Sequence, residues 1–134
     1  PRMACEAANT LWLLERRDHV DVVEDALRAK VIAPDFRHSA VDGRLALAQV
    51  CALTGRHDEA LEWFAAARTV LAEQGAIPLL AICDHDEALM YARRSSPGDA
   101  DRARPLLESA RKQFEAIGMT GWIRRADQLA DRLG

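Results

Sequence analysis

A pattern of small residues with helical spacing recurs along this chain and constrains its fold more than any other feature. The clearest copy contains Ala60, Phe64 and Ala67, followed by Gly75. At offsets of roughly 40 residues, the other copies are Ala103, Leu107, Ala110 and Gly118, and a weaker early set of His19, Val23, Ala26 and Pro34. Because one such repeat holds a pair of helices, the chain is predicted to be all-α. The expected architecture is an α-solenoid of about seven antiparallel helices: three hairpins and a C-terminal capping helix.

Hydrophobic periodicity and turn residues predict where these helices begin and end. Pro34, Gly55 and Gly75 each follow an apolar series with helical spacing, and Pro78 suits the first turn of a helix. The segment Ser95–Asp99 is the strongest turn signal in the chain. No segment alternates with a period of two, so no sheet is expected. The predicted helices cover approximately residues 3–14, 19–33, 35–54, 58–74, 78–94, 100–117 and 120–133.

The alanines of the repeat predict which helix faces are buried. Small residues three or four positions apart let a neighbouring helix approach closely, and the large residue between them fills the space opposite. We therefore expect Ala60, Ala67, Ala103 and Ala110 to be buried, and Ala65 to lie on a more exposed side.

Composition and charge exclude several functional classes. Apolar residues make up 49% of the 134 residues, and 7 Gly and 5 Pro leave little room for disordered linkers, so a single helical repeat domain over residues 1–134 is expected. The formal net charge is −3 and the basic residues are scattered, so direct binding of nucleic acid is not expected. No segment reaches the roughly 18 to 20 apolar residues that cross a bilayer, so no membrane partner is expected either.

The cysteines and the first residue bear on the location and origin of the chain. Cys5, Cys51 and Cys83 show no metal-binding spacing, and buried thiols suit a reducing compartment. A cytoplasmic location is therefore predicted. Because the first residue is Pro1 and not Met, the sequence is interpreted as a C-terminal fragment of a larger protein.

The middle of the chain resembles the tetratricopeptide repeat. The matching residues are Leu47, Ala48, Cys51, Gly55, Ala60, Phe64 and Ala67. The repeat is longer than the common form of about 34 residues. It is similar to arrays in the C-terminal region of large bacterial ATP-dependent transcriptional activators of the LuxR/MalT type, and multidomain nucleotide cyclases and kinases carry similar arrays. This resemblance implies a noncatalytic protein-interaction or effector-sensing module of a bacterial regulatory protein, acting in transcription regulation or signalling. The alternative is an oligomerisation scaffold of a multidomain signalling protein.

The resemblance also implies a partner-binding groove, because the first helix of each pair in such arrays lines the concave surface. The predicted groove residues are Asp42, Leu45, Gln49, Leu53, His85, Leu89 and Arg93, with Ala52, Ile82 and Ala92 beside them. This mixed apolar and charged surface suits a peptide or a helix, and a small effector is an alternative ligand.

Three tryptophans are candidate partner anchors, because exposed aromatic side chains often fill that role. Trp63 and Trp122 are expected to be structural. Trp12 lies in the apolar run Leu11–Leu14, which is broader than one buried stripe requires. Either an upstream repeat covers this surface, or two copies of the chain form a homo-oligomer through Leu11 and Trp12.

No catalytic, cofactor-binding or metal-binding residues are predicted, and the chain is not expected to be an enzyme. The sequences His57–Glu59 and His85–Glu87 each place His, Asp and Glu in succession, but adjacent helical residues point about 100° apart. Capping by Asp58 explains the first set, and a solvated face explains the second. The carboxylate pairs Asp84 with Glu87 and Asp99 with Asp101 lack a nearby nucleophile or cofactor loop.

Overall fold

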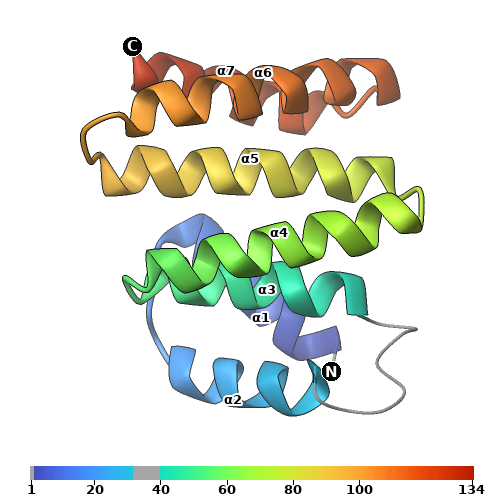
Figure 1. The fold of residues 1–134 in the computed structure, drawn as a ribbon, viewed down its shortest axis with the longest axis vertical. Helices are drawn as coiled ribbons and strands as arrows, with labels where there is room; N and C mark the ends of the chain where they lie inside the picture. The colour runs from blue at the N-terminus through green and yellow to red at the C-terminus, as the bar shows by residue number, and fades with distance from the viewer. Residues whose placement is uncertain (1, 32–39) are drawn as a thin grey trace. The chain divides into compact units, whose positions relative to one another are not determined.

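The structure of the chain is a computed structural model, which describes residues 2–31 and 40–134. These ranges contain seven α-helices and no strand, which confirms the all-α prediction (Figure 1). The helices are α1 (Arg2–Leu14), α2 (Val20–Val31), α3 (Ala40–Leu53), α4 (His57–Glu73), α5 (Ile77–Arg94), α6 (Asp99–Ile117) and α7 (Thr120–Leu133).

Most helix ends lie at the residues that the turn signals indicated. Gly118 follows α6 in the left-handed conformation, and its N–H donates to the carbonyls of Phe114 and Glu115. Pro78 lies in the first turn of α5, where the missing N–H costs no helical hydrogen bond. Helix α4 begins at His57, so the predicted cap Asp58 instead lies within its first turn. The helix end predicted at Pro34 lies outside the described residues.

Packing contacts divide the chain into two compact units, residues 1–70 and residues 71–134. In the first unit, α1, α2 and α3 all contact one another. Their shared core consists of Ala8, Val20, Leu27, Ala46, Leu47 and Val50. The prediction of a single domain over residues 1–134, and that of a solenoid, stay predictions.

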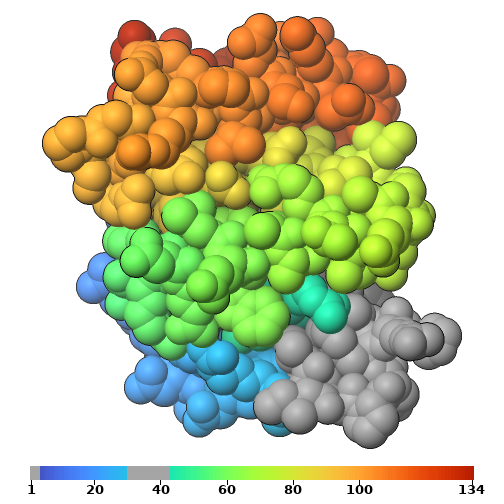
Figure 2. Space-filling model, viewed as in Figure 1, coloured from blue at the N-terminus to red at the C-terminus, as the bar shows by residue number. Residues whose placement is uncertain are grey.

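The second unit repeats this arrangement of three mutually contacting helices. Helix α5 packs mainly on α6, and α7 contacts both of them. In the space-filling view, the side chains of α5 and α6 lie against one another on the face shown (Figure 2). The buried stripe of α6 consists of Ala103, Leu107, Ala110 and Phe114.

The alanine positions confirm the buried faces that the repeat predicted. Ala60, Ala67, Ala103 and Ala110 are each 0% exposed, whereas Ala65 is exposed. A larger side chain at a buried alanine has to displace its neighbours, because helix interfaces are close-packed.

Replacing Ala67 or Ala110 by Leu is therefore expected to lower the free energy of unfolding by roughly 1 to 3 kcal/mol. The matched change Ala65→Leu is expected to alter it by about 0.5 kcal/mol or less. Urea denaturation of the three variants checks this. Equal losses at the three sites would show that the buried faces are wrongly assigned.

Candidate functional site

The predicted groove residues of α3 are buried. Leu45 is 6% exposed, Gln49 2% and Leu53 3%. The Gln49 amide Nε2 donates to Asn9 Oδ1 of α1 at 3.2 Å, so this polar side chain has a structural role. The side chain of Asp42 lies outside the described part of the chain. Burial leaves these α3 positions little surface for a ligand, and their role in partner binding stays a prediction.

The predicted groove residues of α5 differ in exposure. Leu89 and Arg93 are partly exposed, but His85 is only 3% exposed. The His85 ring lies edge-on to Trp122, with centroids 5.3 Å apart, and 6.2 Å from the ring of Phe114. Asp86 is 0% exposed, so the expectation that His85–Glu87 forms a solvated face is wrong.

The tryptophans contribute mainly to packing. Trp12 is 1% exposed, so its ring is not available to a second copy of the chain, and Leu11 is partly buried. Trp63 packs against the core of the first unit and its indole Nε1 donates to Glu59 at 3.4 Å. Trp122 stacks on Phe114 with centroids 5.5 Å apart, and the Arg125 guanidinium lies 4.6 Å from its ring centroid.

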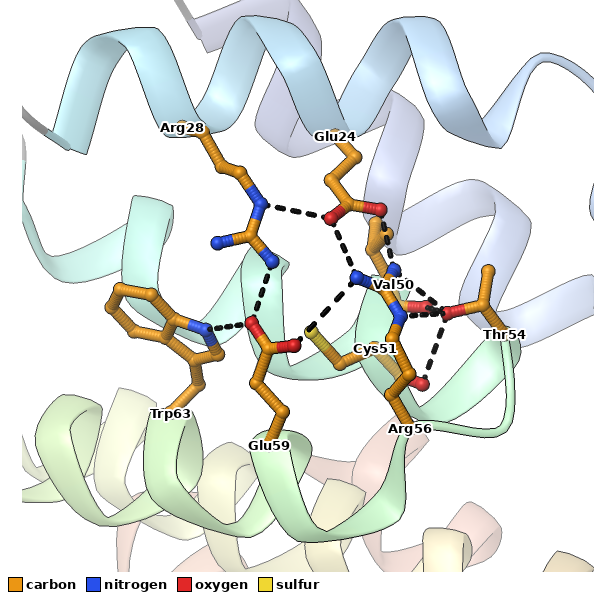
Figure 3. A network of polar contacts seen from close by, with 8 residues as sticks. All are labelled: Glu24, Arg28, Val50, Cys51, Thr54, Arg56, Glu59 and Trp63. Atoms are coloured by element: carbon orange, nitrogen blue, oxygen red, sulfur yellow. Dashed lines mark hydrogen bonds and ion pairs between the residues drawn. The ribbon is translucent and has the colours of Figure 1, made fainter.

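A polar network in the first unit joins α2 to the start of α4 (Figure 3). The Arg56 guanidinium donates to both carboxylate oxygens of Glu24, and Arg28 donates to Glu24 at 2.8 Å and to Glu59 at 2.6 Å. Arg56 also donates to the Thr54 hydroxyl, which in turn donates to the carbonyl of Val50. The two carboxylates are therefore held as paired anions, which suits a structural role better than proton transfer.

The hydrogen bond from Arg56 lowers the pKa of Glu24 from 4.5 to about 2, with Arg28 acting in the same direction. A carboxylate whose pKa falls on folding stabilises the native state above its unfolded pKa, and this contribution is lost as the pH falls through the folded value. Solvent screens the pair, because Arg56 is 38% exposed.

Glu24→Gln is therefore expected to cost about 1 to 2 kcal/mol of unfolding free energy at pH 7. The difference from the unmodified chain is expected to narrow as the pH falls below about 4.5 and to be largely gone near pH 2. Denaturant unfolding across this pH range measures it, with the exposed Glu62→Gln as the control. A difference that stays constant with pH would contradict the proposed ion pairing.

Asp99 and Asp101, the two carboxylates considered as a pair from the sequence, differ in their surroundings. Asp99 is 1% exposed and accepts two hydrogen bonds from Arg94, each 2.8 Å long, which hold the pKa of its carboxyl well below the usual range. Arg102 and the Ser96 N–H also donate to it. The Asp101 side chain is 85% exposed and pairs with Arg104.

An apolar groove lies between α6 and α7, and the prediction of groove residues did not include it. It encloses about 260 Å³. Its floor consists of Leu107, Ala126, Ala130 and Leu133, and its rim of Arg104, Glu108 and Arg111. The α6 residues follow one another at helical spacing, so they form a single stripe about 10 Å long. Ala130 is exposed and Leu133 is partly exposed, so the floor is open to a side chain from outside at these two positions, whereas Leu107 and Ala126 are buried beneath them.

Two arginines of α6 form the edges of this groove, and both contact α7. Arg111 Nε donates to Asp127 Oδ1 at 2.6 Å, and Arg104 donates to the carbonyl of Leu133 at 3.3 Å. Both guanidiniums remain about half exposed, at 41% and 49%. Each guanidinium is also paired with carboxylates, Arg104 with Asp101 and Arg111 with Asp127 and Glu115. The groove therefore has an apolar floor between two edges of ion-paired side chains, and Glu108 lies between these edges on α6.

No protein-family model, no curated protein and no solved structure matches this chain. None of the helices in residues 2–31 and 40–134 is long and apolar enough to cross a lipid bilayer. Within the same ranges, no three His, Cys, Asp or Glu side chains are grouped so that they could hold a metal ion.

Proposed function

We propose that this chain is a noncatalytic protein-interaction module of a larger bacterial regulatory protein, and that its second unit binds an amphipathic helix of a partner. The observation that supports this proposal is the groove between α6 and α7. An apolar floor with a polar rim is the usual receptor for an amphipathic helix, whose apolar side chains recur every three or four residues.

The dimensions of the groove indicate how much of such a partner it accepts. The α6 stripe from Arg104 to Arg111 is about 10 Å long, which is two turns of a helix. Two apolar side chains at i and i+4 on the partner fit this length, and polar side chains flanking them can contact the rim of Arg104, Glu108 and Arg111. Binding by a few buried anchors is typical of protein interfaces.

A library of helical peptides tests this proposal on the full chain. The peptides, about 18 residues long, vary the apolar and charged positions around an i, i+4 pair, and binders are selected by display. Ala130→Arg fills the groove floor and is expected to weaken the binding of the selected peptides at least tenfold, because it blocks the site of their two apolar side chains. Gln128→Arg adds the same charge to an exposed position of α7 outside the groove. It is expected to leave the affinities unchanged.

Equal binding to both arginine variants would contradict the groove as the site, and so would failure to select any binder.

The alternative function, an oligomerisation scaffold, is supported by Leu14 at the end of α1, which is 60% exposed. Sedimentation over a range of concentrations separates the two functions. Self-association that Leu14→Ser abolishes would favour the scaffold, whereas a monomer at all concentrations is the result that our proposal predicts.

A further inference from the structure

A second cavity of about 260 Å³ lies in the second unit, where the end of α5, the turn after it, the start of α6 and the end of α7 meet. Its lining includes Tyr91, Ser95, Ser96, Ala100, Arg132 and Leu133. Unlike the groove between α6 and α7, it is lined more by polar than by apolar groups.

Two of the three hydroxyl groups of this cavity, those of Tyr91 and Ser96, are available as donors. Tyr91 is only 7% exposed, and its hydroxyl makes no hydrogen bond with any described residue. Burial raises the pKa of this phenol, so it keeps its proton at neutral pH and can donate it to an acceptor. The Ser96 hydroxyl is likewise without a partner in the described part of the chain. The Ser96 side chain is exposed and the Tyr91 hydroxyl is not fully buried, so both hydroxyls are accessible to a ligand that enters the cavity.

A cationic side chain and a helix end complete the donor set. Arg132, in the last turn of α7, is exposed and forms no ion pair with the residues that the structure describes. Ala100 lies in the first turn of α6, and that turn has no side-chain cap. The N–H groups of Ala100 and Asp101 have no backbone acceptor in the described ranges, and the helix dipole adds positive potential there.

The acceptors around the cavity are already engaged. At the end of α5, the carbonyl of Tyr91 accepts from the Ser95 N–H at 2.9 Å, and that of Ala92 from the Ser95 hydroxyl at 2.7 Å. The nearby Asp99 carboxylate is neutralised by Arg94 and Arg102, and Asp101 pairs with Arg104. The cavity therefore presents a surplus of donors and one uncompensated positive charge.

We propose that this cavity binds a small oxyanion, the carboxylate or phosphate group of a low-molecular-weight effector, between Tyr91, Ser96, the first turn of α6 and Arg132. An oxyanion accepts several hydrogen bonds at once, and Arg132 supplies the opposite charge. Because the volume of about 260 Å³ lies below the range typical of drug-sized ligands, the ligand is a small acid or phosphate. This second site goes beyond the proposed binding of a partner helix.

Inorganic phosphate and acetate are the probes, each titrated into the ¹⁵N-labelled chain against chloride at the same ionic strength. Saturable changes in the NMR chemical shifts of the Ser96, Ala100 and Asp101 amides are expected with at least one probe. The probe that binds more tightly identifies the chemical group of the ligand. Arg132→Gln is expected to weaken binding roughly tenfold or more, since it removes a charge-assisted hydrogen bond. Tyr91→Phe, which keeps the buried ring, is expected to weaken it about threefold to tenfold.

The matched control is Arg124→Gln, which removes the same charge from an exposed position of α7 that does not line the cavity. It is expected to bind the better probe as the unmodified chain does. Equal weakening by Arg132→Gln and Arg124→Gln would show that only the general surface charge attracts the anion, and would overturn the proposal. Chemical-shift changes that do not saturate with either probe at concentrations of tens of millimolar would overturn the proposal as well. Neither result bears on the helix-binding groove, since Ala130→Arg tests that groove separately.

Discussion

Phe114→Ala is expected to lower the free energy of unfolding by about 3 to 5 kcal/mol. The side chain is 0% exposed and stacks on Trp122, and the His85 ring lies close to both of these rings. Alanine removes the ring and leaves a space that these neighbours fill only in part, so both the transfer term and the cavity term contribute. Urea or guanidinium denaturation, followed by circular dichroism, measures the loss.

The control for this prediction is Ile117→Ala, three residues further along the same helix. Ile117 is 42% exposed, so its truncation is expected to cost less than about 1 kcal/mol. A small loss for Phe114→Ala, similar to that of the control, would contradict the aromatic cluster as the centre of the second unit.

Asp99→Asn is expected to lower the free energy of unfolding by about 2 to 4 kcal/mol at pH 7. The change keeps the size of the side chain but removes the charge that accepts two hydrogen bonds from Arg94 and one each from Arg102 and the Ser96 N–H. Breaking a buried ion pair at one partner is costly because the other charge is left without compensation. Arg94 is 23% exposed, and water reduces that cost without removing it.

Asp101→Asn is the matched control, since Asp101 lies in the same helical turn with a side chain that is 85% exposed. Its unfolding free energy is expected to stay within about 0.5 kcal/mol of the unmodified chain. If both variants lose the same amount, the effect comes from charge near the start of α6 and not from the buried pair.

The helices and their buried alanines could be predicted from the sequence because both are set by local spacing. The range predicted for the last helix, residues 120–133, is that of α7. Gly55, Gly75 and Gly118 have φ of 80°, 65° and 84°, a conformation that glycine adopts without strain after the end of a helix. The alanines follow the helical period, so their burial could be read from the same pattern.

The exposed face of α5 could not be predicted from the helical period. Its buried residues include Ala81, Cys83, His85, Asp86, Ala88 and Met90, which lie around most of the circumference of the helix. A helix that is buried on several sides shows no single apolar stripe, so periodicity cannot distinguish its exposed face. For this reason the expectation that His85 and Asp86 face solvent was wrong.

The proposed binding surfaces could not be predicted from the sequence, because they depend on residues that are distant along the chain. Arg111 meets Asp127 across the groove between α6 and α7, and Arg132 lines a cavity together with Tyr91 and Ser96. The stripe from Arg104 to Arg111 carries a weak signal, since it places two arginines at i and i+7 on either side of Leu107. Nothing in the local pattern separates that arrangement from an ordinary solvated helix face.

Photo-crosslinking in the cell of origin determines whether the groove between α6 and α7 receives a helix of another protein. A photoreactive residue replaces Ala130 in the groove, and Gln128 outside it in a second variant. We expect an adduct with one partner from position 130 alone, attached to a segment with apolar residues at i and i+4. No adduct at position 130, equal adducts at both positions, or an adduct with a second copy of this chain would contradict the proposed helix-binding groove.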